Sequence, residues 1–211
     1  RSAVRARCPA PARRRALVAD GSVEHTLDKD AAVLGGGDHL DVPELRGPAD
    51  DLDGLVGPDP FAEVADVLAR LRPAAPFLSG VTVSGGEATQ QPGFLRALFT
   101  AIKADPDLAR LSCFVDSNGD TEPATWDALD EVLDAAMIDL KCFDDAIHRR
   151  ITGSPNARVL DSIRLLAARG KLYEVRLLLL AGVNDSDDQL VRTGLWLAAI
   201  DPRLRVKVIG Y

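Results

Sequence analysis

From Asp59 onward, short apolar runs alternate with amphipathic segments, and this alternation constrains the fold more than any other feature of the sequence. The runs have the length and composition of buried strands, and the segments between them carry apolar residues at helical spacing. Strands are expected at 81–83, 111–115, 135–140, 174–180 and 205–211, with helices at 60–72, 94–102, 123–133, 159–170 and 186–197. Such alternation predicts right-handed βαβ units and a parallel sheet, which leaves a barrel, a part-barrel or an open sheet as the α/β fold.

Residues 1–57 differ from the rest of the chain. They are rich in Arg, Ala, Pro, Gly and Asp and show no sustained periodicity. The run Gly35-Gly36-Gly37-Asp38-His39 has the residue types of a phosphate loop or a metal site, but no clear strand precedes it, which favours a flexible loop. We therefore expect an irregular segment at 1–57 and one α/β domain at 58–211. The first residue is Arg rather than Met, which suggests a fragment.

The net charge, hydropathy and cysteine content of the sequence argue against several classes of binding partner. The net charge of −7 argues against a broad nucleic-acid surface, and no apolar run reaches the ~20 residues of a membrane span. The three cysteines, Cys8, Cys113 and Cys142, are widely separated and indicate neither a disulfide framework nor a zinc site. A cytoplasmic protein without nucleic-acid or membrane partners is the expectation.

Polar residues follow several of the expected strands. Gly85, Gly86 and Glu87 follow the first, and the paired glycines permit a sharp turn and close approach of a ligand. Asp116 follows the second strand, and Asp139 and Lys141 lie at the end of the third. Because functional groups of parallel α/β folds gather at the carboxyl ends of strands, these residues are the candidate site.

Each candidate also has a structural interpretation. Asp116 suits a turn, Asp139 and Lys141 suit an ion pair on one face of a strand, and Lys141 would alternatively serve as a Schiff-base nucleophile. Arg176 either binds a carboxylate or pairs with a neighbour. His148 is read as a surface histidine.

Five short motifs, taken together, resemble one protein family. In chain order they are Ser84-Gly85-Gly86-Glu87-Ala88, Asp116-Ser117-Asn118-Gly119, Ile138-Asp139-Leu140-Lys141, His148-Arg149-Arg150-Ile151-Thr152-Gly153 and Leu172-Tyr173-Glu174-Val175-Arg176. Their order and spacing resemble the glycyl-radical-enzyme activating branch of the radical S-adenosylmethionine superfamily, which includes the pyruvate formate-lyase activating enzyme. The resemblance covers residues ~58 to 211.

The resemblance implies an oxidoreductase with a partial (βα)6 barrel. It implies S-adenosylmethionine and a [4Fe-4S] cluster as cofactors, a 5′-deoxyadenosyl radical that abstracts hydrogen from a glycine, a glycyl radical enzyme as protein substrate, and flavodoxin or ferredoxin as electron donor. Gly85, Gly86 and Glu87 would meet the amino end of the cofactor. Asp116, Asp139, Leu140, Lys141 and Arg176 would line the same site.

One part of the family pattern is missing from the sequence. The family holds its cluster with three cysteines spaced Cys-x3-Cys-x2-Cys after the first strand, and the 211 residues contain no such spacing. We therefore expect the first βα unit to be missing or degenerate, no metal ligand among the site residues, and a chain that is incomplete or inactive as it stands.

Two explanations of the missing motif lead to different functions. In the first, residues 1–57 are not the native beginning, because the chain is a fragment or its reading frame is shifted. In the second, the chain is a degenerate, cluster-free relative that binds the same kind of partner. An aldolase that uses Lys141 is a minor third hypothesis.

Overall fold

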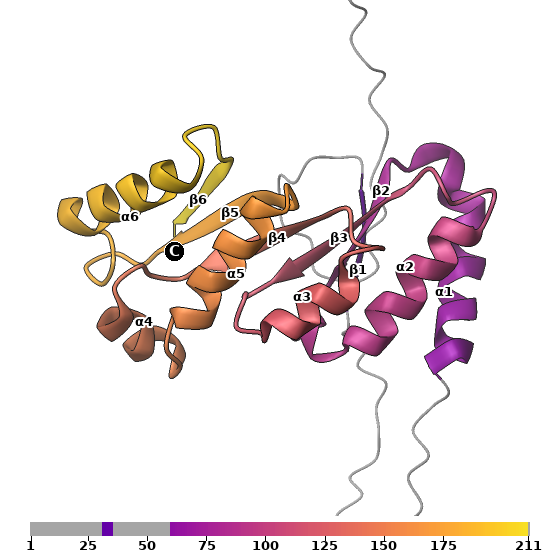
Figure 1. The fold of residues 1–211 in the computed structure, drawn as a ribbon, viewed down its shortest axis with the longest axis horizontal. Coiled ribbons are helices and arrows are strands. Elements are labelled where there is room, and N and C mark those ends of the chain that lie inside the picture. The colour runs from indigo at the N-terminus through magenta and orange to yellow at the C-terminus, as the bar shows by residue number, and fades with distance from the viewer. Residues whose placement is uncertain (1–30, 36–59, 211) are drawn as a thin grey trace, which may run out of the picture.

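The computed structural model describes residues 31–35 and 60–210, and the side chains of 64–210 (Figure 1). All five predicted strands are present. They are β2 (Gly80–Ser84), β3 (Ser112–Ser117), β4 (Ala135–Leu140), β5 (Leu172–Leu179) and β6 (Val206–Gly210). The five predicted helices are α1 (Pro60–Ala74), α2 (Pro92–Ala104), α3 (Pro123–Leu129), α5 (Ala157–Ala168) and α6 (Asp187–Ile200). The predicted alternation is confirmed.

The strands form one parallel sheet whose order follows the chain, from β1 (Ala31–Gly35) to β6 without reversal. Right-handed crossovers in a constant direction place successive helices on the same side of a sheet. Figure 1 shows α2, α3 and α5 along one side of the strands. This is the arrangement of a part-barrel, in which helices cover one face of the sheet and the opposite face is free of these helices.

A further strand, β1 (Ala31–Gly35), lies within the segment for which the sequence indicates irregular structure. It pairs in parallel with β2, from Ala31 opposite Gly80 to Gly35 opposite Ser84. The sheet therefore has a strand where the first βα unit belongs, although no periodicity of the sequence predicts it. Gly35, the first residue of the glycine run, is the last residue of this strand, and residues 36–59 lie outside the described part of the chain.

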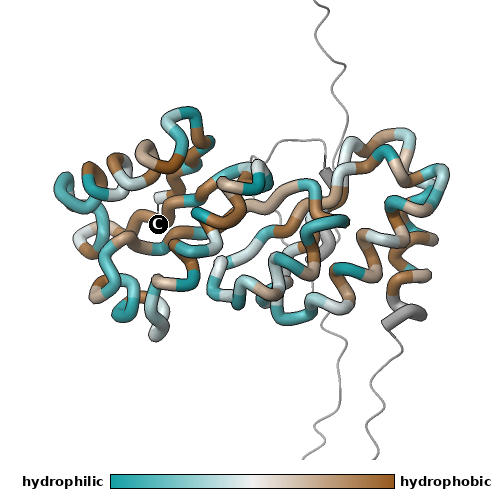
Figure 2. Tube along the Cα trace, viewed as in Figure 1, coloured by the Kyte–Doolittle hydropathy of each residue, from teal (hydrophilic) through white to brown (hydrophobic). Residues whose placement is uncertain are grey.

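The hydrophobic core lies between the sheet and its helices. Alternate strand residues, including Val81, Val115, Ile138 and Val175, face this side and are at most 1 % exposed. They pack with Leu98 and other apolar residues of the helices in one cluster. In Figure 2 brown and teal positions alternate along the helices, as an apolar stripe on each helix requires. Among the described residues, no helix is long and apolar enough to cross a membrane.

Helix α4 (Asp145–Thr152) is not among the helices predicted from the sequence. The Asp144 carboxylate accepts hydrogen bonds from the backbone N–H groups of Ala146 and Ile147 at its start, and Gly153 ends it with φ of 82°. The interpretation of His148 as a surface residue is wrong, because this helix turns His148 inward and leaves it 3 % exposed.

Candidate functional site

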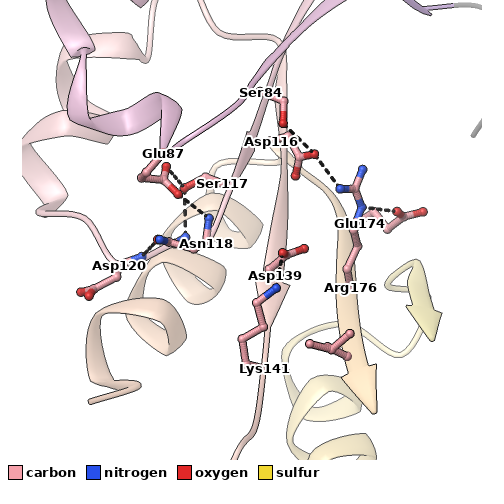
Figure 3. A network of polar contacts seen from close by, with 12 residues as sticks. Ser84, Glu87, Asp116, Ser117, Asn118, Asp120, Asp139, Lys141, Glu174 and Arg176 are labelled. Carbon is pink, nitrogen blue, oxygen red and sulfur yellow. Dashed lines mark hydrogen bonds and ion pairs between the residues drawn. The ribbon is translucent and has the colours of Figure 1, made fainter. Parts of the chain in front are cut away.

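Four neighbouring strands bring polar side chains to the face opposite the helices (Figure 3). The register places Thr82 opposite Phe114, so that Ser84 and Asp116, two residues further along, also lie side by side. It pairs Asp139 with Arg176 directly. Because side chains alternate between the two faces of a strand, the residues between these positions point into the core instead. Asp116, Asp139 and Arg176, predicted from β3, β4 and β5, therefore share one face.

The turn after β2 is built around Glu87. Gly85 and Gly86 have φ angles of 108° and 49°, which favour glycine, and they turn the chain back toward the sheet. Glu87 Oε1 then accepts hydrogen bonds from the Thr89 backbone N–H, the Thr89 hydroxyl and the Ser117 hydroxyl, at 3.0, 2.8 and 2.8 Å. Its Oε2 accepts one from the Asn118 N–H at 2.8 Å. The carboxylate ties the turn after β2 to the turn after β3.

This geometry changes the role expected of Glu87. Both of its carboxylate oxygens already accept hydrogen bonds from within the protein. The groups of this turn that remain available to a ligand are therefore chiefly the backbone atoms of Gly85 and Gly86. Both glycines are exposed, and a Cβ built on Gly86 would meet no atom within 4 Å. Glycine is required there by the positive φ, and the space beside it is open to an approaching group.

Arg176 lies between two carboxylates. Its Nη1 is 2.6 Å from Asp116 Oδ2 and its Nε is 3.3 Å from Glu174 Oε1. The Ser84 hydroxyl donates to the same Asp116 oxygen at 3.4 Å, and Arg176 Nη2 lies 3.0 Å from the Met137 sulfur. The Arg176 side chain is only 11 % exposed, so the alternative in which it pairs with its neighbours describes this structure.

Burial governs the protonation of this group of residues. Desolvation raises the pKa of Asp116 above its usual value, and the Arg176 guanidinium opposes that shift. Desolvation acts to lower the pKa of Arg176, but Asp116 and the other nearby carboxylates outweigh it and raise that pKa. Arg176 therefore stays charged, and of the two residues Asp116 is the one whose charged form is disfavoured by desolvation.

Asp139 and Lys141 form a second ion pair on the same face. Lys141 Nζ is 2.6 Å from Asp139 Oδ2, and both side chains remain more than a quarter exposed. In Figure 3 the Lys141 side chain reaches back along β4 to Asp139, as expected for residues two positions apart. This pair is closer to solvent than the Arg176 group and is open to exchange with a charged ligand.

Leu140 is not brought to this face. Its side chain is 1 % exposed and belongs to the hydrophobic core. The prediction that this side chain lines the site does not match its position, because strand alternation turns Leu140 to the helix side when Asp139 and Lys141 face the other way. Only its backbone is near the site.

Three residues near the site are not among the predicted site residues. Ser117 is buried on the helix side of β3, and its hydroxyl reaches Glu87 from the strand end. Glu174 lies on the polar face and contacts Arg176 directly. Lys207 lies in register with Arg176 on β6 and is half-buried. The alternation of Glu174 with Arg176 was visible in the sequence, but the register of β6 was not.

The face carries charges of both signs. Asp116, Asp139 and Glu174 supply carboxylates, and Lys141, Arg176 and Lys207 supply cations. A compact array of this kind suits a zwitterionic ligand, since separate cationic and anionic groups of the ligand find opposite charges close together. The exposed glycine backbone beside the array adds hydrogen-bonding groups without side-chain obstruction.

A metal centre does not fit the described residues. No group of three or more His, Cys, Asp or Glu side chains in the described part of the chain is placed to hold a metal ion. Cys113 and Cys142 are 0 % and 6 % exposed, and burial raises the pKa of the Cys113 thiol to about 12 and that of Cys142 in the same direction. Thiols that resist ionisation in a core are poor ligands for an iron–sulfur cluster.

Comparison with known proteins shows similarity both to a protein family and to individual proteins. The family model described as "Radical SAM superfamily" matches residues 50–193. The pyruvate formate-lyase-activating enzyme of Staphylococcus aureus (strain USA300) is 28% identical over 161 residues, which cover 72% of this chain and 64% of that protein. The matched region thus spans less than two thirds of this relative's length.

Two solved structures share the fold. A domain of pyruvate-formate lyase-activating enzyme from Bacteroides vulgatus ATCC 8482 superposes with a TM-score of 0.54 at 27% identity, covering 63% of this chain and 81% of that one. Streptococcus suis SuiB superposes with a TM-score of 0.56 at 17% identity, covering 70% of this chain and 33% of that one. The second similarity concerns the fold alone.

Proposed function

The chain belongs to the radical SAM superfamily, and on that basis we propose that it is an oxidoreductase of the kind that activates glycyl radical enzymes. The polar face at the strand ends carries this proposal, because it combines an open glycine turn with paired charges. Similarity to pyruvate formate-lyase-activating enzymes supports the choice of protein substrate. The electron donor would be a flavodoxin or a ferredoxin.

The polar face fits the methionine moiety of S-adenosylmethionine. That moiety carries an ammonium group and a carboxylate, and the cofactor has a further positive charge on sulfur. The exposed backbone of Gly85 and Gly86 would hold the ammonium group, and Lys141, now paired with Asp139, would bind the ligand carboxylate. Asp116 and Asp139 would supply negative charge to the cationic cofactor.

The [4Fe-4S] cluster of this superfamily supplies the electron that cleaves S-adenosylmethionine. Cys113 and Cys142 do not fit that cluster, because both are buried thiols of the folded domain. Cys8 lies outside the described residues. We therefore assign no electron-transfer step to residues 60–210, and their proposed part in the reaction is to bind and orient the cofactor.

A second candidate function follows from the same cysteine positions. A cluster-free relative would keep the fold and the partner-binding surface and would act as a binding module for a glycyl radical enzyme. The burial of both described thiols favours this candidate over a chain that assembles its cluster from them.

Resequencing the coding locus and reconstituting its product separate the two candidates. The activating-enzyme proposal expects a Cys-x3-Cys-x2-Cys loop upstream or in another reading frame. The loop-bearing product should then take up about four iron atoms per chain under anaerobic conditions, cleave S-adenosylmethionine, and form a glycyl radical on pyruvate formate-lyase in electron paramagnetic resonance spectra. An intact frame without the loop, together with iron-free binding of pyruvate formate-lyase, would establish the binding module instead.

A further inference from the structure

Asn184 is a buried residue that is not among the predicted site residues. It lies in the loop after β5 and is 4 % exposed. Its Nδ2 donates hydrogen bonds to the backbone carbonyls of Lys141 and Leu178, both at 2.7 Å. Its Oδ1 accepts a hydrogen bond from the Leu180 N–H at 2.7 Å. Every hydrogen-bonding group of the amide is thus used on the backbone at the ends of β4 and β5.

These contacts begin where the backbone pairing of the two strands ends. The last paired residues are Leu140 and Leu177, so Lys141 and Leu178 are the next residues in register. The amide of Asn184 joins their carbonyls in place of a further ladder hydrogen bond. Lys141 therefore lies beyond the end of β4 and yet has a fixed backbone.

A second buried asparagine holds the residues that follow. Asn156 is 4 % exposed, and its Nδ2 donates to the carbonyls of Cys142 and Phe143 at 3.2 and 2.7 Å. Three consecutive carbonyls, at 141, 142 and 143, thus receive hydrogen bonds from two buried amides. The segment cannot shift without breaking buried hydrogen bonds, each of which is costly to leave unmade.

We propose that Asn184 is a positioning residue that sets where the Lys141 ammonium stands in the site. A lysine side chain is long and loses much rotamer freedom when it is held in one place, so a fixed backbone is needed to keep its ammonium 2.6 Å from Asp139. Asn184 touches Lys141 only through the backbone, and it acts on the ligand through Lys141. The effect on S-adenosylmethionine rests on the proposed function, whereas the effect on Lys141 does not.

The chain offers matched variants for a test. Asn184→Ala removes all three hydrogen bonds, and Asn184→Asp keeps an acceptor for the Leu180 N–H but loses both donors. Asp185→Ala is the control, because Asp185 is an exposed residue of the same loop whose carboxylate accepts a hydrogen bond from the Gly182 N–H of that loop. Thermal melts establish whether each variant is folded. If Asn184→Ala does not fold, Asn184→Asp is used alone for the test.

Calorimetric titration with S-adenosylmethionine gives the first result. Asn184→Ala and Asn184→Asp should each weaken binding by about tenfold, and Asp185→Ala should change it less than about twofold. In a Lys141→Met background the Asn184 substitutions should have no further effect, since Asn184 acts through Lys141. Equal losses in both backgrounds, or no loss in either, would overturn the proposal.

Nuclear magnetic resonance of lysine labelled with 13C at Cε gives a result that needs no ligand. The Lys141 signal should shift in Asn184→Asp and stay in place in Asp185→Ala, while the signals of Lys103 and Lys171 stay unchanged in both. An unmoved Lys141 signal would overturn the inference. If wild-type protein binds no S-adenosylmethionine, the proposed function fails, and the Lys141 signal still decides the role of Asn184.

Discussion

Arg176 is the residue on which the internal charge balance of the site depends. It is the direct cationic partner of two carboxylates, Asp116 and Glu174, and all three side chains are at most 20 % exposed. The raised pKa of Asp116 shows that burial already disfavours its charge even with Arg176 present. Without the guanidinium, the two carboxylates would be left close together without their shared partner.

Replacing Arg176 with methionine should therefore destabilise the fold strongly. Removing one partner of a buried ion pair costs about 3–5 kcal/mol, because the other charge stays desolvated. Urea unfolding at pH 7 measures the change. Arg164→Met is the control, because Arg164 pairs with Asp161 at an exposed position and its loss should cost about 0–1 kcal/mol. Equal losses in the two variants would show that the Arg176 pairs contribute no more than surface pairs.

For single residues, the sequence predicts the face of the sheet on which a side chain lies better than it predicts the hydrogen-bond partner of that side chain. Strand alternation correctly brings Asp139 and Lys141 to one face, and the same rule explains why Leu140 leaves it. The four hydrogen bonds to Glu87 come from residues 2 to 31 positions away. Contacts between separate turns depend on the register of the strands, and no local sequence pattern predicts that register.

Among the elements, the turn after β3 connects the site to the helical layer. The Ser117 hydroxyl donates to Glu87 and accepts from the Gly119 N–H, and the Gly119 carbonyl accepts from Ser162 of α5. Ser162 in turn accepts from the Trp126 indole N–H of α3. A continuous set of hydrogen bonds thus runs from the helices to the turn that carries the glycine pair.

Gly119→Ala should disrupt this element more than a comparable substitution elsewhere. Gly119 has φ of 73°, and a Cβ there would lie 2.8 Å from the Ile138 side chain. Gly153 has a similar φ of 82°, but its Cβ would meet nothing within 4 Å. We expect Gly153→Ala to cost about 1–2 kcal/mol from backbone strain alone, and Gly119→Ala at least about 1 kcal/mol more from overpacking.

Chemical denaturation of the two alanine variants measures this difference. If Gly119→Ala is no less stable than Gly153→Ala, the packing between this turn and β4 is looser than the structure indicates.

Elements with strong periodicity were predictable, and short polar ones were not. The five strands and five helices from Pro60 onward follow from apolar spacing. Helix α4 is only eight residues long, and its sequence is dominated by charged and polar residues, so its formation depends on the Asp144 cap and on the inward packing of His148. The pairing of β1 with β2 arises from a segment with little local signal.

Across the whole molecule, buried ionisable groups couple folding to pH. His148 is 3 % exposed, and its Nδ1 has no hydrogen-bond partner. Desolvation lowers the pKa of His148 below its usual value of 6.5, despite the opposing effects of the Cys142 backbone and Asp145. The unfolded chain therefore binds a proton at this residue at a higher pH than the folded chain does.

The stability of the protein should accordingly fall on acidification. The contribution of neutral His148 is fully present above about pH 6.5 and is lost as the pH falls through the folded-state pKa. Urea unfolding between pH 7.5 and 5.5 should show this decline in wild type and a shallower one in His148→Gln. Identical slopes would show that His148 does not account for the coupling.

The polar face of the molecule is proposed to bind S-adenosylmethionine, and isothermal titration of the 211-residue chain tests this binding without iron. We expect saturable binding at one site per chain, weakened about tenfold or more by Lys141→Met, because a charge-assisted hydrogen bond is lost, and unchanged by Arg164→Met. Absence of saturable binding by the folded chain, or equal binding by wild type and Lys141→Met, would show that the polar face is not the S-adenosylmethionine site.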